Sequence, residues 1–436
     1  MSLLLRRPIA WVRLRRSRSA ILGLACVAAA AVHAQSPLTL DDALREAQLR
    51  SRQLSAQDAA ALAARELSVA AGRRPDPVIK GSVTNLPIDG PDRYSITRDF
   101  MTMRSIGVMQ EFTREDKRAA RSARFQREAE LAQAGRVEAL ADLQRGTAVA
   151  WLELHYRSRM LELMQAQRAE AQLQVEAADA AYRGGRGAQA EAIAARSAVA
   201  AIDDQLRMAG RDVATARTRL ARWVGEPAGR ELGAVPAGLD RMPMRLEDLD
   251  ALLEDHPRIA SLARQESLAR ADLDVAKSDK KSDWSAEVMY SQRGPAYSNM
   301  VSLSVSIPWQ WDAANRQDRE ASAKAALVQR AHDEREEARR EVLASTRGAL
   351  QAWQANRERL AQYDATLIPL ASERVRAAQA AYRGASGPLG AVLDARRAEL
   401  DVRLERLRIE METAGLWAQL TYLIPAQTSA ASAKEQ

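Results

Sequence analysis

Cysteine is nearly absent from this chain. The one cysteine among 436 residues, Cys26, lies inside an apolar run from Ala20 to Val32. Residues 1–34 also hold six arginines and no acidic residue, and Ala34 precedes Gln35. A basic segment, an apolar run and a small residue in this order are typical of a secretory signal. We therefore predict a signal peptide over residues 1–34, cleaved after Ala34.

Removal of that segment would take away the only cysteine. The mature chain would then have neither disulfides nor thiolate metal sites. The apolar run of about 13 residues is too short to cross a bilayer as a helix. One alternative stays open, in which Cys26 is the acylated first residue of a lipoprotein. Against it, Gly23 stands where the lipoprotein recognition sequence usually has leucine.

Aromatic residues are also scarce, at 4% of the chain. Few aromatics and many Ala, Leu, Arg and Glu residues indicate long helices that pack through small side chains. The formal net charge is +7, but the six arginines of residues 1–34 account for all except about one of these charges. Because no basic patch with interleaved aromatics occurs elsewhere, the sequence argues against a nucleic-acid partner.

Signatures of catalysis are missing as well. The four histidines, His33, His155, His256 and His332, are scattered along the chain. There is no His-x-x-x-His pair, no nucleophile elbow and no phosphate-binding loop. We predict no enzymatic activity, no catalytic residue, no cofactor and no metal site.

A repeated segment organises the sequence. Ala180–Arg196 reads AAYRGGRGAQAEAIAAR, and Ala380–Arg396, 200 residues later, reads AAYRGASGPLGAVLDAR. Each copy follows one long helical pattern and precedes another, so both copies are interpreted as tips of helical hairpins. Their glycines permit a backbone with positive φ, and Pro388 suits the start of a helix. The period is too long for a solenoid, so we predict two repeats, over 35–235 and 236–425, and a disordered tail over 426–436.

The same order of elements is predicted in each half. Helical patterns cover 38–72, 115–182 and a return helix to about 223, and then 246–276, a long stretch to 382 and a return helix to about 422. Thr346, Trp353, Leu360 and Leu367 are spaced by sevens, as in a coiled-coil seam. Pro369 is expected to kink or break the second long helix. Strands are predicted near 78–86, 104–112, 284–291 and 301–307.

The fourth predicted strand alternates strictly. Ser302, Ser304 and Ser306 lie between Val301, Leu303, Val305 and Ile307, which gives one polar and one apolar face. Alternation alone favours a hairpin on helices in a soluble α+β protein. The predicted export, and the lack of any other sheet to join, favour a membrane, where a sheet has to close. Four strands are too few for a membrane barrel, so several chains would each contribute four strands.

The order of helix, strand hairpin, very long helix, glycine-containing tip and return helix, repeated twice, resembles the TolC family of outer-membrane efflux proteins. The resemblance covers the mature chain, and its most specific matches are the two tips and the segment Arg104–Arg118. It implies a mainly α fold with four strands per chain, a homotrimer with a 12-stranded barrel in the outer membrane, and an α-helical tunnel in the periplasm. It also implies a periplasmic adaptor and an inner-membrane pump of the proton-driven resistance-nodulation-division type as partners.

The resemblance also suggests site residues at the tips. Glu191, Tyr382 and Asp394 match positions that close the periplasmic end of the tunnel, although Gly387 and Ala391 replace charged residues of the family prototype. The alternatives are a solvated helix face for the carboxylates and packing for the tyrosines. The candidate adaptor contacts are Tyr182, Arg183, Gly184, Gly187, Arg383, Gly384 and Gly387, and Ser302, Ser304 and Ser306 are the candidate lumen-facing residues.

The cargo is the open part of this hypothesis. The phrase from Asn85 to Arg118 resembles the heavy-metal branch of the family, the cobalt-zinc-cadmium or copper-silver exporters. The alternatives are the same channel with organic toxicants or polypeptides as cargo, and a periplasmic coiled-coil structural or adaptor protein. Met101, Met103 and Met109 near the second strand are interpreted as packing residues, with soft-metal binding as the alternative, since thioethers suit Cu(I).

Overall fold

The computed structural model describes residues 36–185, 187–241, 249–384 and 386–425. The predicted signal peptide and the predicted disordered tail lie outside these ranges. From Pro37 onward, the described residues form one compact unit.

The first helical region, expected over 38–72, consists of two helices. Helix α1 spans Leu40–Arg50 and α2 spans Arg52–Ala71, with Ser51 between them in an extended conformation. The Ser51 hydroxyl accepts a hydrogen bond from the Leu54 amide at 3.3 Å, and so acts as the N-cap of α2. A serine that caps a helix competes with continuation of the preceding one, which explains the break.

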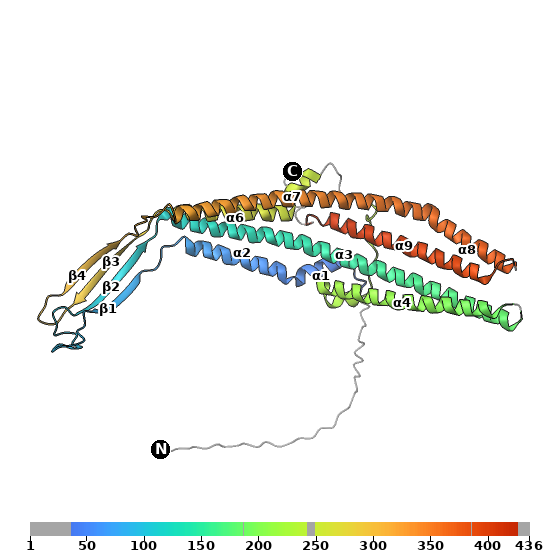
Figure 1. The fold of residues 1–436 in the computed structure, drawn as a ribbon, viewed down its shortest axis with the longest axis horizontal. Helices are drawn as coiled ribbons and strands as arrows, with labels where there is room; N and C mark the ends of the chain where they lie inside the picture. The colour runs from blue at the N-terminus through green and yellow to red at the C-terminus, as the bar shows by residue number, and fades with distance from the viewer. Residues whose placement is uncertain (1–35, 186, 242–248, 385, 426–436) are drawn as a thin grey trace, which may run out of the picture. The chain divides into compact units, whose positions relative to one another are not determined.

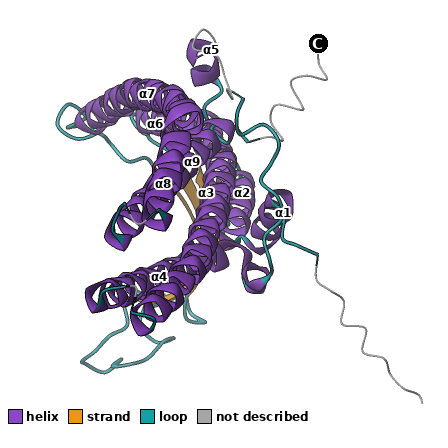
Figure 2. Ribbon diagram, turned by 90° about the vertical axis from the view of Figure 1, so that its right-hand side faces the viewer, coloured by secondary structure: helices purple, strands orange, loops and turns teal. Residues whose placement is uncertain are grey.

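The first long helix is the centre of the fold. Helix α3 spans Glu115–Arg183 in 69 residues and contacts α1, α2, α4, α6 and α9 (Figure 2). Its Trp151 is fully buried and donates a hydrogen bond from the indole nitrogen to the Leu38 carbonyl at 3.0 Å. The return helix α4 spans Gln189–Val224 and is followed by the 3-10 turn η1, Glu226–Gly229. Much of the surrounding core is alanine, as the composition predicts.

The second half contains α5, Leu249–Glu254, and α6, Pro257–Ser278, and later the long α7, Gln317–Gln362. The seam residues Thr346, Trp353 and Leu360 are buried, and Leu367 is half-buried. A π turn, η3, Tyr363–Leu367, then leads into α8, Ile368–Arg383, and α9 spans Leu389–Thr421. Pro369 lies in the first turn of α8, and the regular α geometry is interrupted just before it, where a kink or break was expected. The chain nevertheless stays helical, because the π turn accommodates the missing N–H of the proline.

All four strands form one antiparallel sheet in the order β1-β2-β3-β4 (Figure 1). Strands β1, Val78–Thr84, and β2, Met103–Phe112, form one hairpin, and β3, Trp284–Gln292, and β4, Met300–Ser306, form the other. Pairing of β2 with β3 joins the two halves of the chain. Among the described residues, no strand pairs with the outer edge of β1 or of β4.

The glycines at the tips differ from the expectation. Only Gly185 has a positive φ, +70°, whereas φ is −82° at Gly184 and −79° at Gly384. Gly187 and Gly387 instead allow the tip to pack closely against the end of the preceding helix. A Cβ atom on either would lie 3.1 Å from the Cβ of Ala181 or Ala381, respectively. Tight packing against the preceding helix, more than unusual backbone angles, therefore explains these two glycines.

His256 caps α6 with its side chain. Its Nδ1 accepts a hydrogen bond from the Arg258 amide at 3.2 Å, and the residue is buried. Burial, and then the nearby charges of Arg145 and Arg258, lower the pKa of this imidazole to about 4. The cap therefore works only with neutral histidine, because protonation would remove the acceptor and leave a charge in a buried place.

This burial predicts a loss of stability in mild acid. The folded-state pKa is below the unfolded value, so the unfolded chain binds more protons between pH 6.5 and 4, and the stability falls as pH falls through this window. We expect a loss of about 2 kcal/mol at pH 5 relative to pH 7 from this group. His256→Asn keeps a capping side chain and should make the stability depend less on pH between pH 7 and pH 5. Thermal unfolding of the unmodified protein and of His256→Asn at pH 7 and pH 5 measures this loss of stability. An equal loss in the two proteins would contradict the prediction.

Candidate functional site

The sheet has an apolar face. Residues directly opposite each other in antiparallel strands share a face, and Leu303, Val288, Val108 and Ile79 are opposite one another in turn across the four strands. All four are exposed, with 78% of Leu303 accessible. The apolar face consists mainly of Ile79, Val83, Ile106, Val108, Val288, Tyr290, Val301, Leu303 and Val305. An apolar surface of this extent marks contact with lipid or with another protein.

The other face, here called the polar face, carries most of the hydrophilic side chains. Lys80 and Glu287 form an ion pair at 2.6 Å, and the hydroxyls of Ser105 and Ser291 are 2.8 Å apart. The predicted lumen-facing serines lie on this face and are exposed. Ser302, Ser304 and Ser306 are opposite Met289, Glu287 and Ser285, respectively. The two faces of the sheet therefore differ in polarity across all four strands, although Arg104, Gln110 and Gln292 lie on the apolar face.

Aromatic residues gather where the strands meet the helices. Phe112 ends β2, Trp284 begins β3, and their rings stack with centroids 4.2 Å apart. Trp309 and Trp311, just after β4, are each 86% exposed. Such residues are enriched at membrane–water boundaries. Sequence reasoning overlooked these two tryptophans, although their position directly after an alternating strand was the available signal.

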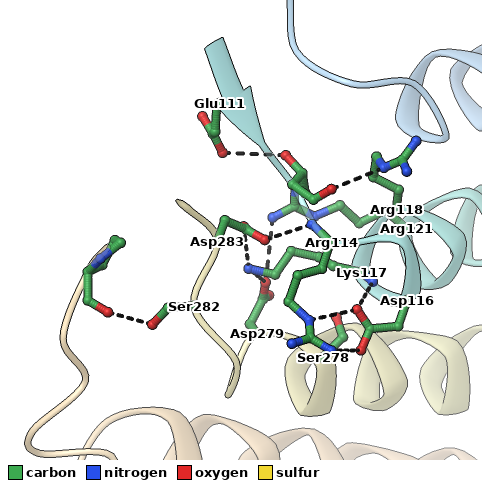
Figure 3. Close-up of polar contacts among 12 residues, drawn as sticks. Glu111, Arg114, Asp116, Lys117, Arg118, Arg121, Ser278, Asp279, Ser282 and Asp283 are labelled. Atoms are coloured by element: carbon green, nitrogen blue, oxygen red, sulfur yellow. Dashed lines mark hydrogen bonds and ion pairs between the residues drawn. The ribbon is translucent and has the colours of Figure 1, made fainter. Parts of the chain in front are cut away.

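A buried ion cluster holds the strand–helix junction together (Figure 3). The Lys117 side chain is only 8% exposed, and its ammonium nitrogen lies 2.8 Å from Asp283 and 3.1 Å from Asp279. Asp283 also accepts a hydrogen bond from the Arg114 amide at 3.0 Å. Sequence reasoning did not find this cluster, because its members are about 165 residues apart in the chain.

The charges in this cluster support one another. Burial disfavours the ammonium form of Lys117, but the hydrogen bonds to Asp283 and Asp279 outweigh it and raise the pKa of Lys117. Burial likewise opposes ionisation of Asp283, and its bonds to Lys117 and to the Arg114 amide outweigh that and lower its pKa. Lys117 and Asp283 are therefore both charged at neutral pH.

Hydrogen bonds beside this cluster join further crossings between the sheet and the helices. Arg118, in the first turn of α3, donates hydrogen bonds to the carbonyls of Thr113 and Gly72, at 3.3 and 3.2 Å. Gln310, which follows β4, donates to the Asp279 carbonyl at 3.1 Å. The ends of α2, β2, α6 and β4 are thus held at one place, which sets the direction in which the helices leave the sheet.

The predicted gate residues lie near the tips but do not form one cluster. Glu191, in the first turn of α4, accepts a hydrogen bond from the Leu389 amide at 3.4 Å and so joins the two tips at the N-terminus of α9. Tyr382 is half-buried against the apolar cluster of α3, α4 and α9. Asp394 is exposed and lines a cavity of about 230 Å³ between these helices. No hydrogen bond or ion pair joins these three side chains among the described residues.

The candidate adaptor contacts are mostly on the surface. Tyr182, Arg183, Gly184, Arg383 and Gly384 are exposed, whereas Gly187 and Gly387 are half-buried.

The arginines that close the two repeated motifs have different partners. Arg196 pairs with Asp179 of α3 at 2.9 Å, and Arg396 pairs with Glu170 of α3 at 2.8 Å. Both return helices are therefore tied to α3.

Within the described ranges, no helix is long and apolar enough to cross a membrane. No group of three or more His, Cys, Asp or Glu residues in that part of the chain is arranged to hold a metal ion.

No protein-family model matches the chain, and no curated protein matches it. Solved structures do. The outer membrane protein VceC from Vibrio cholerae superposes with a TM-score of 0.73 at 18% identity, over 88% of this chain and 95% of VceC. CusC gives 0.75 at 14% identity over 89% and 92%. The open state of the MtrE outer membrane channel of Neisseria gonorrhoeae gives 0.71 at 16% identity over 88% of each chain. These structures are TolC-family outer-membrane channels, so the chain has the fold of that class.

Proposed function

We propose that this chain is the outer-membrane channel of a tripartite efflux system and passes substrate passively from a pump and an adaptor to the exterior. The observation that carries the proposal is the exposed apolar face, backed by a polar face, on a sheet whose two edges are free within the described chain. In water an exposed apolar face of this size would promote aggregation. In a bilayer the same face would contact the lipid chains, as the outer face of a membrane barrel does. The fold that the chain shares with outer-membrane channels supports the same function.

The sheet is suited to closure by copies of itself. Because β1 to β4 alternate in direction, β4 of one copy would pair antiparallel with β1 of the next when the copies are related by rotation. Three copies would give a 12-stranded barrel, which is within the range of membrane barrels. We therefore propose a homotrimer, with the apolar face toward outer-membrane lipid and Ser302, Ser304 and Ser306 toward the lumen.

The helices would then form a tunnel in the periplasm. Helix α3, with 69 residues, is about 100 Å long at 1.5 Å per residue. The repeats proposed over 35–235 and 236–425 would each supply one hairpin to its wall. The tips, with Tyr182, Arg183, Gly184 and Gly187 and their counterparts Arg383, Gly384 and Gly387, would meet the periplasmic adaptor and the inner-membrane pump. In this arrangement the pump supplies the free energy, and the channel itself needs no cofactor and performs no catalysis.

Heavy-metal cations are the proposed cargo, and organic toxicants or polypeptides are the alternatives. The support is the sequence phrase from Asn85 to Arg118, and a passive duct needs no cargo-specific site. The susceptibility of a deletion strain separates the classes. Sensitivity to zinc, cadmium, cobalt, copper or silver alone supports metals, and sensitivity to dyes, detergents and antibiotics alone supports organic cargo.

The rival function is a periplasmic coiled-coil structural or adaptor protein. It has the same long helices but no lipid-facing sheet. Membrane partition distinguishes the two, because a barrel stays with the outer membrane after salt and alkaline washing and a peripheral protein is released.

Conductance of the purified protein in a planar bilayer tests the channel and its gate together. Three copies would place three Glu191 and three Asp394 carboxylates around the axis at the tips, where they would attract cations. We expect a cation-selective current that becomes less selective in the double variant Glu191→Ala and Asp394→Ala, with Asp240→Ala, outside the tips, as the matched control. A current with unchanged selectivity would remove these carboxylates from the gate, and the absence of any current would contradict the channel.

A further inference from the structure

One charged side chain interrupts the apolar face of the sheet. Arg104 of β2 is opposite Val83 of β1 and Gln292 of β3, so it shares this face with the aliphatic residues. The four strands contain two carboxylates, Glu111 and Glu287, and the strand register puts both on the polar face. The charge of Arg104 therefore has no counter-charge among the strand residues of its own face.

The guanidinium of Arg104 has few partners within the described chain. One terminal nitrogen is 3.5 Å from the Arg293 carbonyl oxygen, which is a weak hydrogen bond, and the buried Nε has no acceptor. The loop carboxylate nearest in sequence, Asp99, instead accepts hydrogen bonds from the amides of Met101 and Thr102, at 2.8 and 3.1 Å. Because a guanidinium has five N–H donors, terminal donors of Arg104 remain available to a ligand.

The position of Arg104 along β2 matches one boundary of the apolar face. The β2–β3 ladder has Arg104 opposite Gln292 at one end of this face and the stacked rings of Phe112 and Trp284 at the other. These ends are about 27 Å apart at about 3.4 Å per residue, or about 20 Å across a membrane at a strand tilt of about 40°. The apolar bands of membrane barrels are about 25 Å tall.

The direction of the chain tells the two boundaries apart. The helices join the sheet at the aromatic end, where Phe112 precedes α3 and Trp284 follows α6, and the hairpin loops lie at the other end (Figure 1). If the helices are in the periplasm, as proposed, Arg104 lies at the depth of the head groups of the outer leaflet.

Two uncharged polar side chains lie beside Arg104 on the same face. Gln292, directly opposite, is exposed. Tyr290 is opposite Ile106, which makes it a diagonal neighbour of Arg104, and it is 45% exposed. Diagonal neighbours are about 7–8 Å apart, within reach of long side chains. An amide and a phenol can both donate hydrogen bonds, so the three side chains present N–H and O–H donors at one place.

We infer that Arg104, with Gln292 and Tyr290, binds the phosphate of a lipid head group in the outer leaflet of the outer membrane. Phosphate supplies the negative charge that this face lacks, and two of its oxygens match the planar fork of a guanidinium. A charge on the lipid side of a barrel is also tolerated better near the membrane boundary than at the midplane. The inference rests on the proposed channel, and each copy of the chain would hold one such lipid.

Binding of a phosphorylated glycolipid to the detergent-purified protein tests the site. The probes are diphosphoryl lipid A, the same lipid after enzymatic removal of its phosphates, and inorganic phosphate, and native mass spectrometry measures binding. We expect the phosphorylated lipid to bind at least tenfold more tightly than the dephosphorylated one, and Arg104→Gln to lose this preference. Arg98→Gln, which replaces an exposed arginine of the β1–β2 loop, is the matched control and should keep it.

A second variant guards against misfolding. Arg104→Lys keeps the charge, and we expect at least threefold weaker binding of the phosphorylated lipid, because an ammonium does not make the two parallel hydrogen bonds of a guanidinium. Unchanged affinity in both Arg104 variants would overturn the inference. A loss in Arg98→Gln as large as in Arg104→Gln would also overturn it, since the attraction would then be diffuse. Equally tight binding of inorganic phosphate would replace the lipid site with a general phosphate site.

Conductance in a planar bilayer separates this inference from the proposed function. Arg104 lies on the face opposite the proposed lumen, so Arg104→Gln should conduct as the unmodified protein does. A conducting channel whose lipid binding is independent of Arg104 would retain the channel and remove the lipid site. Absence of conductance in the unmodified protein would contradict the channel, while the binding assay would still decide whether Arg104 recognises phosphate.

Discussion

Leu303→Arg is expected to abolish assembly in the membrane, and Ser304→Arg is expected to leave it intact. The two residues are neighbours on β4 and both are exposed, but Leu303 lies on the apolar face and Ser304 on the polar face. Arginine on the lipid side of a barrel costs about 2–4 kcal/mol at the bilayer midplane. Three copies would multiply this to about 6–12 kcal/mol per assembly. The measurement is the fraction of oligomer that stays with outer membranes after alkaline washing.

The pair of variants also distinguishes a lipid-facing sheet from a soluble one. Leu303→Ala keeps the face apolar and should assemble, which shows whether loss of leucine packing alone matters. Helix content by circular dichroism reports whether the helical part still folds in each variant. If the two arginine variants behave alike, the apolar face does not contact lipid, and the periplasmic coiled-coil function becomes the better account.

Lys117→Met should be among the most destabilising single changes in the helical part of the chain. Within the described residues, it removes the only lysine partner of Asp283, whose side chain is 15% exposed, and one of the two cationic partners of Asp279, at the point where the strands and helices meet. Removal of one partner of a buried ion pair costs about 3–5 kcal/mol. Lys281→Met is the matched control, because Lys281 lies at the same junction, is 62% exposed, and is 3.7 Å from Asp116. Exposed pairs contribute about 0–1 kcal/mol.

Urea unfolding of the purified protein measures both lysine variants. We expect a clearly lower midpoint for Lys117→Met and a nearly unchanged one for Lys281→Met. Adding Asp283→Asn to Lys117→Met removes the carboxylate that has lost its lysine and should recover part of the lost stability, since the effects of substitutions in one ion network are not additive. Equal midpoints for the two lysine variants would show that the buried cluster does not hold the junction.

Much of the element pattern could be predicted from local sequence signals. Strict alternation located β4, and uninterrupted helical periodicity located α3 to within a residue of its ends, Glu115 and Arg183. The repeated Tyr-Arg-Gly phrase located both hairpin ends. These features depend on residues that are close together in the sequence, so they can be recognised from the sequence alone. The exact form of the breaks at Ser51 and at the π turn before Pro369 was harder to predict. A capping residue or a proline indicates that the regular helix changes, but it does not indicate which conformation replaces it.

The candidate site depended on contacts between distant parts of the chain. Composition and local patterns by themselves predicted long alanine-rich helices, four strands, an apolar and a polar side on the strands of the second half, and the same order of elements in both halves. The tertiary structure alone decided that β2 pairs with β3, that Lys117 meets Asp283, and that Glu191 reaches the Leu389 amide. Periodicity is a property of one segment, whereas register and ion pairing belong to two segments brought together by packing, and no single stretch of sequence specifies its partner.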